Sequence, residues 1–137
     1  MTDLLTCGEY QAIASDLTPP QSPFIDGKFH RGSGKILPTL NPATGNKITE
    51  VSTPSPEQIN LAVEKARESF DQGRWCNLHP SERKEVLIRL CKLITRNKRE
   101  LAVMESLDSG KPIRDCELID IPESINTIKW HAEAIDK

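Results

Sequence analysis

The hydrophobic pattern divides the chain near Thr53 into a first part with short apolar runs and a second part with helical periodicity. In the first part, Phe24–Phe29 places Asp-Gly between apolar pairs, which predicts a β-hairpin because both turn positions tolerate positive φ. Extended pieces are predicted at 35–40 and 47–52, the latter from its β-branched residues. Asn41–Gly45 between them is predicted to be a turn, since proline fixes φ at its second position.

Four amphipathic helices are predicted after Thr53, each from apolar residues at helical spacing. The apolar sets are, in chain order, Ile59, Ala62, Val63, Ala66 and Phe70; Val86, Leu87, Leu90, Cys91 and Ile94; Leu101, Met104 and Leu107; and Ile121, Ile125, Ile128, Ala132 and Ile135. Each set is expected to be the buried face of its helix.

The ends of these helices are predicted from local signals. Ser55 and Gln58 form a capping box around a proline at the first helical position. The next helix begins near His79 with another proline. Gly110 can supply the left-handed residue that ends the third helix, and Asp120 is predicted to cap the fourth.

Residues 1–23 are expected to be a flexible N-terminal arm, because the prolines between Thr18 and Pro23 prevent regular structure. The remainder, residues 24–137, has four one-sided helices and strands with too few partners. Such elements leave apolar surface uncovered. The sequence therefore predicts the N-terminal part of an α/β domain, incomplete as a domain.

The composition of the chain argues against nucleic-acid binding and against insertion in a membrane. The net charge is −2, with 18 basic residues interleaved with 20 acidic ones, so no nucleic-acid partner is expected. No stretch approaches the roughly 18 apolar residues of a membrane helix, and the N-terminus does not resemble a signal peptide. We therefore expect a cytoplasmic protein without a membrane partner.

The four cysteines Cys7, Cys76, Cys91 and Cys116 lie far apart, without the paired spacing of a zinc site or a redox motif. Reduced thiols in a cytoplasm are the simplest interpretation. No cysteine has a helix N-terminus or a neighbouring histidine that would lower its pKa. We therefore predict no catalytic residue in this chain.

Two other stretches were candidates for ligand binding. Gly32–Lys35 lacks the spacing of a phosphate-binding loop and is better explained as a hairpin connection. Glu105 and Asp108 share one face of the third helix with apolar residues. Such carboxylates need a compensating charge, which could come from Lys111, from an arginine such as Arg83, or from a bound cation. Spacing alone favours a structural salt bridge.

From Phe24 to Lys137 the chain resembles the N-terminal segment of an aldehyde dehydrogenase. The residues that carry the resemblance are Phe24–Lys28, Asn41–Gly45, Ala62–Phe70, Trp75, Arg83, Leu87, Leu101, Glu105–Pro112, Asp120–Pro122 and Lys129–Lys137. Two stretches, Gly-Lys-Pro-Ile-Arg and the closing Trp-His-Ala-Glu-Ala-Ile-Asp-Lys, are most similar to aldehyde dehydrogenases of the γ-glutamyl-γ-aminobutyraldehyde type.

The resemblance implies a Rossmann-like coenzyme-binding domain and the oxidation of an aldehyde, such as an aminoaldehyde, to a carboxylic acid with NAD or NADP. In that family a thiolate attacks the carbonyl, hydride passes to nicotinamide, and a glutamate activates water. The family residues that perform these steps follow the segment that this chain resembles. No cofactor-binding residue is therefore assigned here, and the chain alone is predicted to be inactive.

The resemblance also implies one binding site and an assembly. Many members bind a monovalent cation, Na⁺ or K⁺, through carbonyls before the Asn-Pro-x-Thr-Gly turn and the aspartate of the Asp-x-Gly-Lys-Pro stretch. The corresponding residues here are Thr39, Leu40 and Asp108, and oxygen ligands suit a hard cation. We expect Asp108 to lie near Thr39 or Leu40. The complete enzyme is expected to form a homo-oligomer, a dimer or a tetramer.

Two alternatives stay open at this point. The chain could be a non-catalytic helical interaction module, whose partner would bind the Ile121, Ile125 and Ile128 face. It could also be a fragment of an acylating, CoA-dependent aldehyde dehydrogenase.

Overall fold

The computed structural model describes residues 4–135 and 137, which form two β-hairpins and a set of helices. The strands are β1 (Phe24–Ile25), β2 (Lys28–Phe29), β3 (Ile36–Leu40) and β4 (Lys47–Ser52). β1 pairs with β2 and β3 pairs with β4, both antiparallel, with a bulge between Thr39 and Leu40. The α/β class expected from the sequence is thus confirmed for these elements.

Both predicted turns are present. Asp26 and Gly27 between β1 and β2 have φ values of 50° and 79°, the positive pair that a two-residue hairpin needs. In the second turn, the Gly45 N–H donates to the Asn41 carbonyl at 2.7 Å. The Asn41 side chain accepts from the Ala43 N–H at 2.8 Å.

The helices follow the local capping signals at most of their ends. They are α1 (Cys7–Asp16), α2 (Pro56–Asp71), α3 (Pro80–Arg96), α4 (Lys98–Ser109), the short α5 (Ile113–Asp115), the π-helix η1 (Cys116–Asp120) and α6 (Ile121–Ala134). Ser55 and Gln58 form the predicted capping box of α2. His79 caps α3, and Gly110 ends α4 with a φ of 74°.

The helix α1 corrects the expectation that residues 1–23 lack regular structure. Thr6 accepts from the Glu9 N–H, and the Glu9 carboxylate accepts from the Thr6 N–H, so a capping box starts the helix. This Thr-x-x-Glu signal was present in the sequence. The prolines that follow the helix favour irregular structure only for their own part of the segment, and they do not prevent a helix before them.

A second correction concerns Asp120, the predicted cap of the last helix. Asp120 has helical φ and ψ values, and its side chain makes no capping hydrogen bond. The chain is already helical from Ile113, and a π-turn joins α5 to α6. The Asp120 carboxylate binds Lys111 instead, at 2.6 and 2.7 Å.

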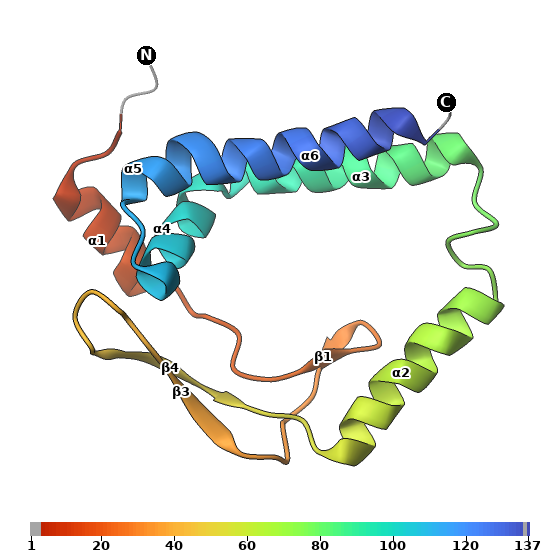
Figure 1. The fold of residues 1–137 in the computed structure, drawn as a ribbon, viewed down its shortest axis with the longest axis horizontal. Helices are drawn as coiled ribbons and strands as arrows, with labels where there is room; N and C mark the ends of the chain where they lie inside the picture. Colours follow the sequence, from red (N-terminus) through yellow and green to blue (C-terminus); the bar gives the residue numbers. More distant parts are fainter. Residues whose placement is uncertain (1–3, 136) are drawn as a thin grey trace.

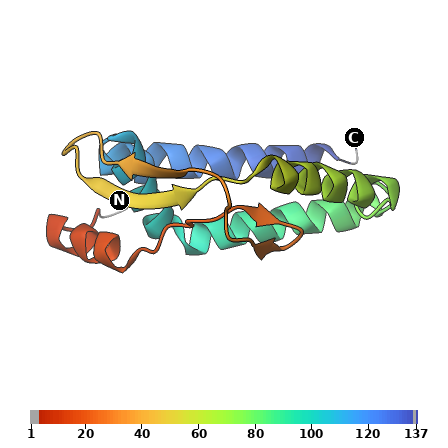
Figure 2. The same cartoon turned by 90° about the horizontal axis from the view of Figure 1, so that it is seen from below.

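The elements are arranged as an open ring (Figure 1). α3 and α6 pack as an antiparallel pair along one side, and α1 packs on α4 at one end. The hairpins and α2 form the opposite side, nearer to the viewer in Figure 2. The buried residues of this fold are few: Ile25, Cys91, Ala102, Val103, Cys116, Glu117 and Ala132. Most of them lie where α3, α4, η1 and α6 meet.

The predicted buried face of α2 is wrong. Ile59 is 51% exposed, while Val63 and Phe70 are each 65% exposed. α2 contacts β1 through only part of this face, where Ala62 and Ala66, together with Ser69, line a shared hollow with the hairpin. Its apolar stripe of Ile59, Val63 and Phe70 is therefore left uncovered.

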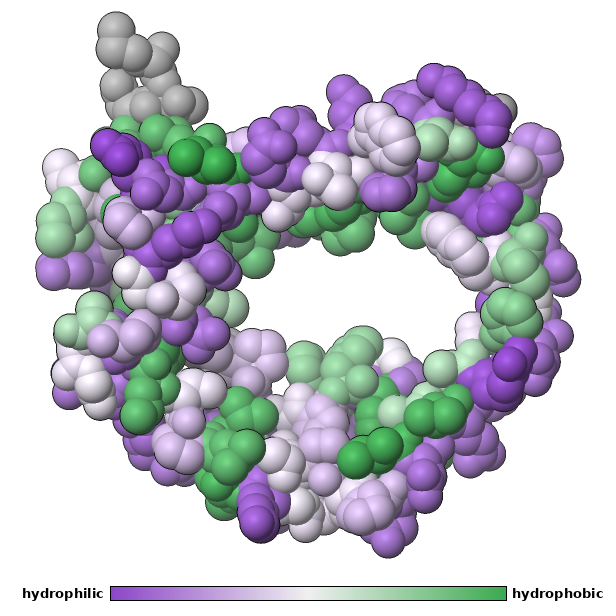
Figure 3. Space-filling model, in the orientation of Figure 1, coloured by the Kyte–Doolittle hydropathy of each residue, from purple (hydrophilic) through white to green (hydrophobic). Residues whose placement is uncertain are grey.

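The opposite situation holds for α6. Ile121, Ile125 and Ile128 are half-buried because α6 packs against α3, so they do not form the free face that an interaction module would offer. Figure 3 shows hydrophobic side chains gathered instead around the opening of the ring. No helix of the described residues has the length and apolar character needed to cross a membrane.

Candidate functional site

The candidate site lies at the carboxyl end of α4. Glu105 and Asp108 stand in its last turns, and no basic residue accompanies them there. The carbonyls at a helix C-terminus carry partial negative charge, so this end of the helix combines carboxylate and dipole charge of the same sign. Such an arrangement favours a cation.

Gly110 brings this helix end against the turn between β3 and β4. A Cβ on Gly110 would lie only 2.8 Å from Cγ of Pro42, closer than real Cβ contacts. The positive φ of Gly110 is a second reason for glycine at this position. The turn therefore packs directly on the end of α4.

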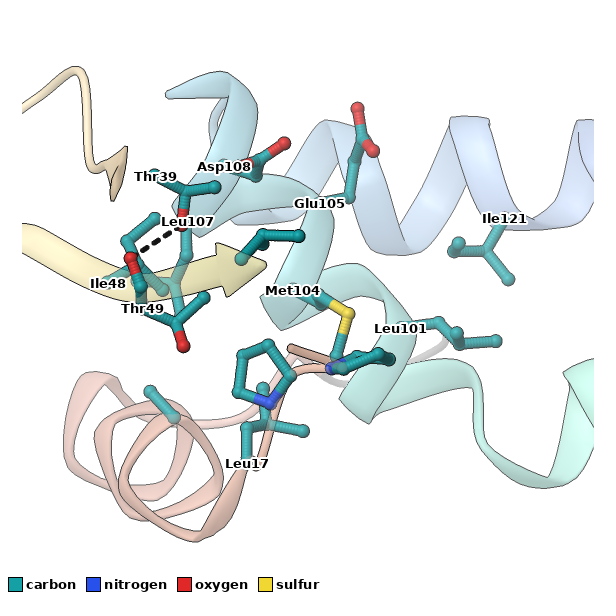
Figure 4. A pocket seen from close by; sticks show the side chains of 14 residues that line it. Leu17, Thr39, Ile48, Thr49, Leu101, Met104, Glu105, Leu107, Asp108 and Ile121 are labelled. Carbon is teal, nitrogen blue, oxygen red and sulfur yellow. Dashed lines mark hydrogen bonds between the residues drawn. The ribbon is translucent and has the colours of Figure 1, made fainter. Parts of the chain in front are cut away.

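A cavity of about 480 Å³ lies between α1, the β3–β4 hairpin and α4. We call it the α4 cavity. It is lined by Ala14, Leu17, Pro19, Pro20, Thr39, Ile48, Thr49, Val51, Leu101, Met104, Glu105, Leu107, Asp108 and Ile121. Its wall is largely apolar, and Figure 4 shows Thr39 and Asp108 toward the same end of it.

Two of the three residues assigned by resemblance thus line one cavity. Thr39 and Asp108, which are far apart in sequence, line one cavity, whereas Leu40 is not among its lining residues. The Thr39 hydroxyl donates to the Thr49 carbonyl at 3.5 Å, and its oxygen retains a further lone pair. Carboxylate, hydroxyl and carbonyl oxygens are the donors that a hard cation takes.

The salt bridge favoured by spacing is not formed. Lys111 pairs with Asp120 rather than with Glu105 or Asp108, and this hydrogen bond raises the pKa of the Lys111 ammonium. Within the described part of the chain, neither Glu105 nor Asp108 has an ion-pair partner. Arg83 does not reach them either, and its Nε is buried without a hydrogen bond.

Two of the four cysteines are exposed, and Cys7 is the first residue of α1, which corrects the expectation that no cysteine lies at a helix N-terminus. The other two are unsuited to nucleophilic attack. Cys116 is fully buried, and burial raises the pKa of its thiol, which opposes thiolate formation. Cys91 is also buried and donates to the Ile125 carbonyl at 3.7 Å. Among residues 4–135 and 137, no group of three or more His, Cys, Asp or Glu side chains is placed to hold a metal ion. A cation in the α4 cavity would therefore depend on hydroxyl and carbonyl oxygens as well as Asp108.

A polar cluster joins α1, the start of α4 and η1, and it was not among the predicted site residues. Glu117 of η1 is only 3% exposed. Its carboxylate accepts from the Tyr10 hydroxyl at 2.6 Å and lies 3.6 Å from Nε of Arg99. No sequence signal marked Glu117 as buried, because the π-turn that buries it shifts the helical register.

A family model described as the aldehyde dehydrogenase family matches residues 29–137. The chain belongs to this family. The resemblance identified from the Asn-Pro-Ala-Thr-Gly and Ser-Gly-Lys-Pro stretches is thereby confirmed.

Individual relatives agree with the family. The chain is 51% identical to the aminoacetaldehyde dehydrogenase of Pseudomonas aeruginosa, over 100% of this chain and 28% of that protein. It is similar in structure to the γ-glutamyl-γ-aminobutyraldehyde dehydrogenase of Burkholderia cenocepacia, with a TM-score of 0.92 and 36% identity. That match covers 97% of this chain and 27% of the other.

A third similar structure is a variant of the P. syringae indole-3-acetaldehyde dehydrogenase AldA, in complex with NAD⁺ and IAA. Its TM-score is 0.91 at 35% identity, and the match covers 97% of this chain and 27% of that chain. The present chain thus spans between a quarter and a third of the length of these relatives. The open ring is therefore the arrangement that these elements adopt within much longer chains.

Proposed function

We propose that this chain is the N-terminal portion of the Rossmann-like coenzyme domain of an NAD- or NADP-dependent aldehyde dehydrogenase. The observation that carries the proposal is the match over 97% of the chain to aldehyde dehydrogenase structures, at TM-scores of 0.91 and 0.92. The substrate class that we propose for the whole enzyme is an aldehyde with an amino group. It is supported by the 51% identity to an aminoacetaldehyde dehydrogenase.

The chemistry of the whole enzyme would be supplied by a nicotinamide coenzyme that accepts hydride from the substrate. The residues described here do not provide its reactive groups, because the buried Cys116 and Cys91 are unsuited to nucleophilic attack. Their proposed role is structural: α3 and α6 form one wall of the domain, and the uncovered α2 stripe receives the rest of the polypeptide.

We further propose that a monovalent cation binds at the end of the α4 cavity, with Asp108 and Thr39 among its ligands. The family resemblance suggests the carbonyl of Leu40, which does not itself line the cavity, as a third. The unpaired carboxylate at the end of α4 and the oxygen donors beside it support this proposal. The free thiols of all four cysteines support a reducing compartment such as the cytoplasm. A homo-oligomer is proposed for the complete enzyme from the family alone.

A chimera tests the proposed function. This chain replaces the matching N-terminal segment of the P. aeruginosa aminoacetaldehyde dehydrogenase, and NADH formation from aminoacetaldehyde and from propanal is measured by absorbance. We expect the chimera to form NADH, because the incoming segment carries the same fold. The chain alone is expected to remain at the blank rate, because the family residues that perform the reaction are expected to follow this segment. A folded but inactive chimera would overturn the proposal, and so would NADH formation by the isolated chain.

A further inference from the structure

The only charged side chain that is buried among the described residues is that of Glu117. A carboxylate removed from water is costly unless hydrogen bonds or opposite charges compensate for it. Glu117 has two such partners. One carboxylate oxygen accepts the short hydrogen bond from Tyr10, and the other faces Arg99.

Glu117 and its two partners belong to three different elements. Tyr10 is on α1, Arg99 is near the start of α4, and Glu117 is on η1. The Tyr10 oxygen also accepts from the Leu5 N–H at 3.2 Å, so the chain before α1 is attached to the same group. Further ionisable groups on the same elements include Glu9 on α1, whose carboxylate accepts from the Thr6 N–H at 2.8 Å, and Cys116 on η1.

The π-helical geometry explains how Glu117 reaches this position. In η1 the backbone bonds span five residues, which inserts one extra residue into the helix and rotates the following side chains. π-turns of this kind are found often at functional positions. Here the turn buries Cys116 and Glu117 side by side and points the carboxylate at α1.

α1 has few other attachments of comparable strength. None of its residues is buried, and its most extensive packing is on α4. Yet Ala14 of α1 and Leu17, its C-cap residue, line the α4 cavity together with Pro19 and Pro20. Figure 4 shows Leu17 and Met104, the latter from α4, among the side chains that line the cavity. The position of α1 therefore decides whether this side of the cavity is covered.

We propose that α1 is a strap that covers the α4 cavity, and that the Tyr10–Glu117 hydrogen bond is the latch that holds the strap closed. Tyr10 and Glu117 are positioning residues in this arrangement, since neither lines the α4 cavity. The latch does not depend on the proposed cation or on the proposed enzyme activity. It rests on the buried carboxylate, its partner on α1 and the cavity-lining residues that α1 and its C-cap supply.

Met104 reports the state of the strap. It is the only methionine besides Met1, it is half-buried, and it lines the α4 cavity. The rate of its oxidation by hydrogen peroxide, followed by mass spectrometry, is compared in the wild type, Tyr10→Phe and Ser15→Ala. Tyr10→Phe keeps the ring and removes only the hydroxyl. Ser15→Ala is the matched control, because Ser15 is exposed on the same helix and bonds only to Gln11 of α1.

We expect Tyr10→Phe to speed Met104 oxidation, and amide exchange across residues 7–16, by about tenfold, the factor that corresponds to the loss of one hydrogen bond to a charged group. Ser15→Ala should match the wild type. Amide protection in α3 and α6 is measured in the same samples and should be unchanged, which separates strap opening from unfolding.

The tyrosine itself provides an independent signal, because Tyr10 is the only tyrosine in the chain. Burial and the hydrogen bond to Glu117 raise the pKa of its phenol, which is read from the ultraviolet absorbance of tyrosinate. Glu117→Gln removes the negative charge and should lower this pKa toward its ordinary value. Equal oxidation rates in the wild type and Tyr10→Phe would overturn the latch. An ordinary tyrosine pKa in the wild type would overturn it as well.

Discussion

At the scale of single residues, the exposed carboxylate of Asp108 is the group on which the proposed cation site depends. It lies in the last turn of α4, where the helix dipole repels negative charge, and it has no ion-pair partner in the described chain. A carboxylate so placed costs about 0.3–1 kcal/mol. The cavity beside it supplies Thr39 as a further oxygen donor.

The variant Asp108→Asn distinguishes a cation site from a tolerated charge. In choline chloride, the variant should be more stable than the wild type by about 0.3–1 kcal/mol, because the repulsion is removed. In NaCl or KCl at the same ionic strength, the wild type should gain stability and the variant should not. The measurement is the melting temperature in each salt. Glu64→Gln, on the exposed side of α2, is the charge-matched control and should respond equally to all three salts.

A wild type whose melting temperature is the same in choline, sodium and potassium salts would refute the cation proposal. The α1 latch would be unaffected by that result, because Tyr10 and Glu117 do not line the α4 cavity.

At the scale of elements, Gln58 joins α2 to the chain before β3. Its side-chain oxygen accepts from the Ser55 N–H at 3.0 Å and from the Ser33 hydroxyl at 2.9 Å. Its amide nitrogen donates to the Arg31 carbonyl at 2.9 Å. One side chain thus completes the capping box and holds the glycine-containing connection that was considered as a phosphate loop.

We predict that Gln58→Ala destabilises the chain by about 1–2 kcal/mol, the range expected for a lost helix cap. Urea unfolding followed by circular dichroism measures the change. Gln72→Ala is the control, since the Gln72 side chain at the other end of α2 bonds to the Glu68 and Arg74 side chains near the surface and should change stability by less than about 0.5 kcal/mol. Equal effects of the two substitutions would contradict the role of Gln58.

The elements that could be predicted from the sequence are those fixed by short-range chemistry. Asp26-Gly27 needs only positive φ at two adjacent residues, and Ser55 with Gln58 needs only one helical turn. Both were predicted, and both are present. The same chemistry at Thr6 and Glu9 was available and was overlooked.

The remaining features depend on contacts between distant segments. The π-turn at Cys116–Asp120 arises where η1 packs on α4 and α6, so no local pattern showed that Asp120 would continue a helix. The lining of one cavity by Thr39 and Asp108 was expected only through the resemblance to a family. The burial of Glu117 depends on a partner 107 residues away, a distance at which periodicity carries no information.

At the scale of the whole molecule, the open ring leaves the apolar stripe of α2 exposed, although the periodicity of the sequence predicted that this stripe is buried. A stripe of this kind normally faces an apolar partner. In the structures matched at TM-scores of 0.91 and 0.92, the segment that corresponds to this chain is only 27% of the whole polypeptide. The rest of an aldehyde dehydrogenase polypeptide is therefore the partner that fits. The prediction that this stripe is buried is wrong for the described residues, and its burial against further polypeptide is part of the proposed function.

The substitution Val63→Asp tests this explanation by comparing two contexts. In the present chain Val63 is 65% exposed, so an added charge should change stability by no more than about 0.5 kcal/mol. In the chimera with the P. aeruginosa enzyme, the same charge would be buried against the added polypeptide and would lack a partner. Burial of an unpaired polar group costs at least about 1–3 kcal/mol, so the chimera should melt several degrees lower and yield less NADH-forming enzyme.

Asn60→Asp is the matched control, because it adds the same charge to α2 at an exposed position outside the stripe. It should be neutral in both contexts. If Val63→Asp is as harmless in the chimera as in the isolated chain, the stripe does not receive the rest of the enzyme. If it is harmful in both, Val63 already supports the ring itself. Only sensitivity that appears together with the added polypeptide identifies the stripe as the surface on which the domain is completed.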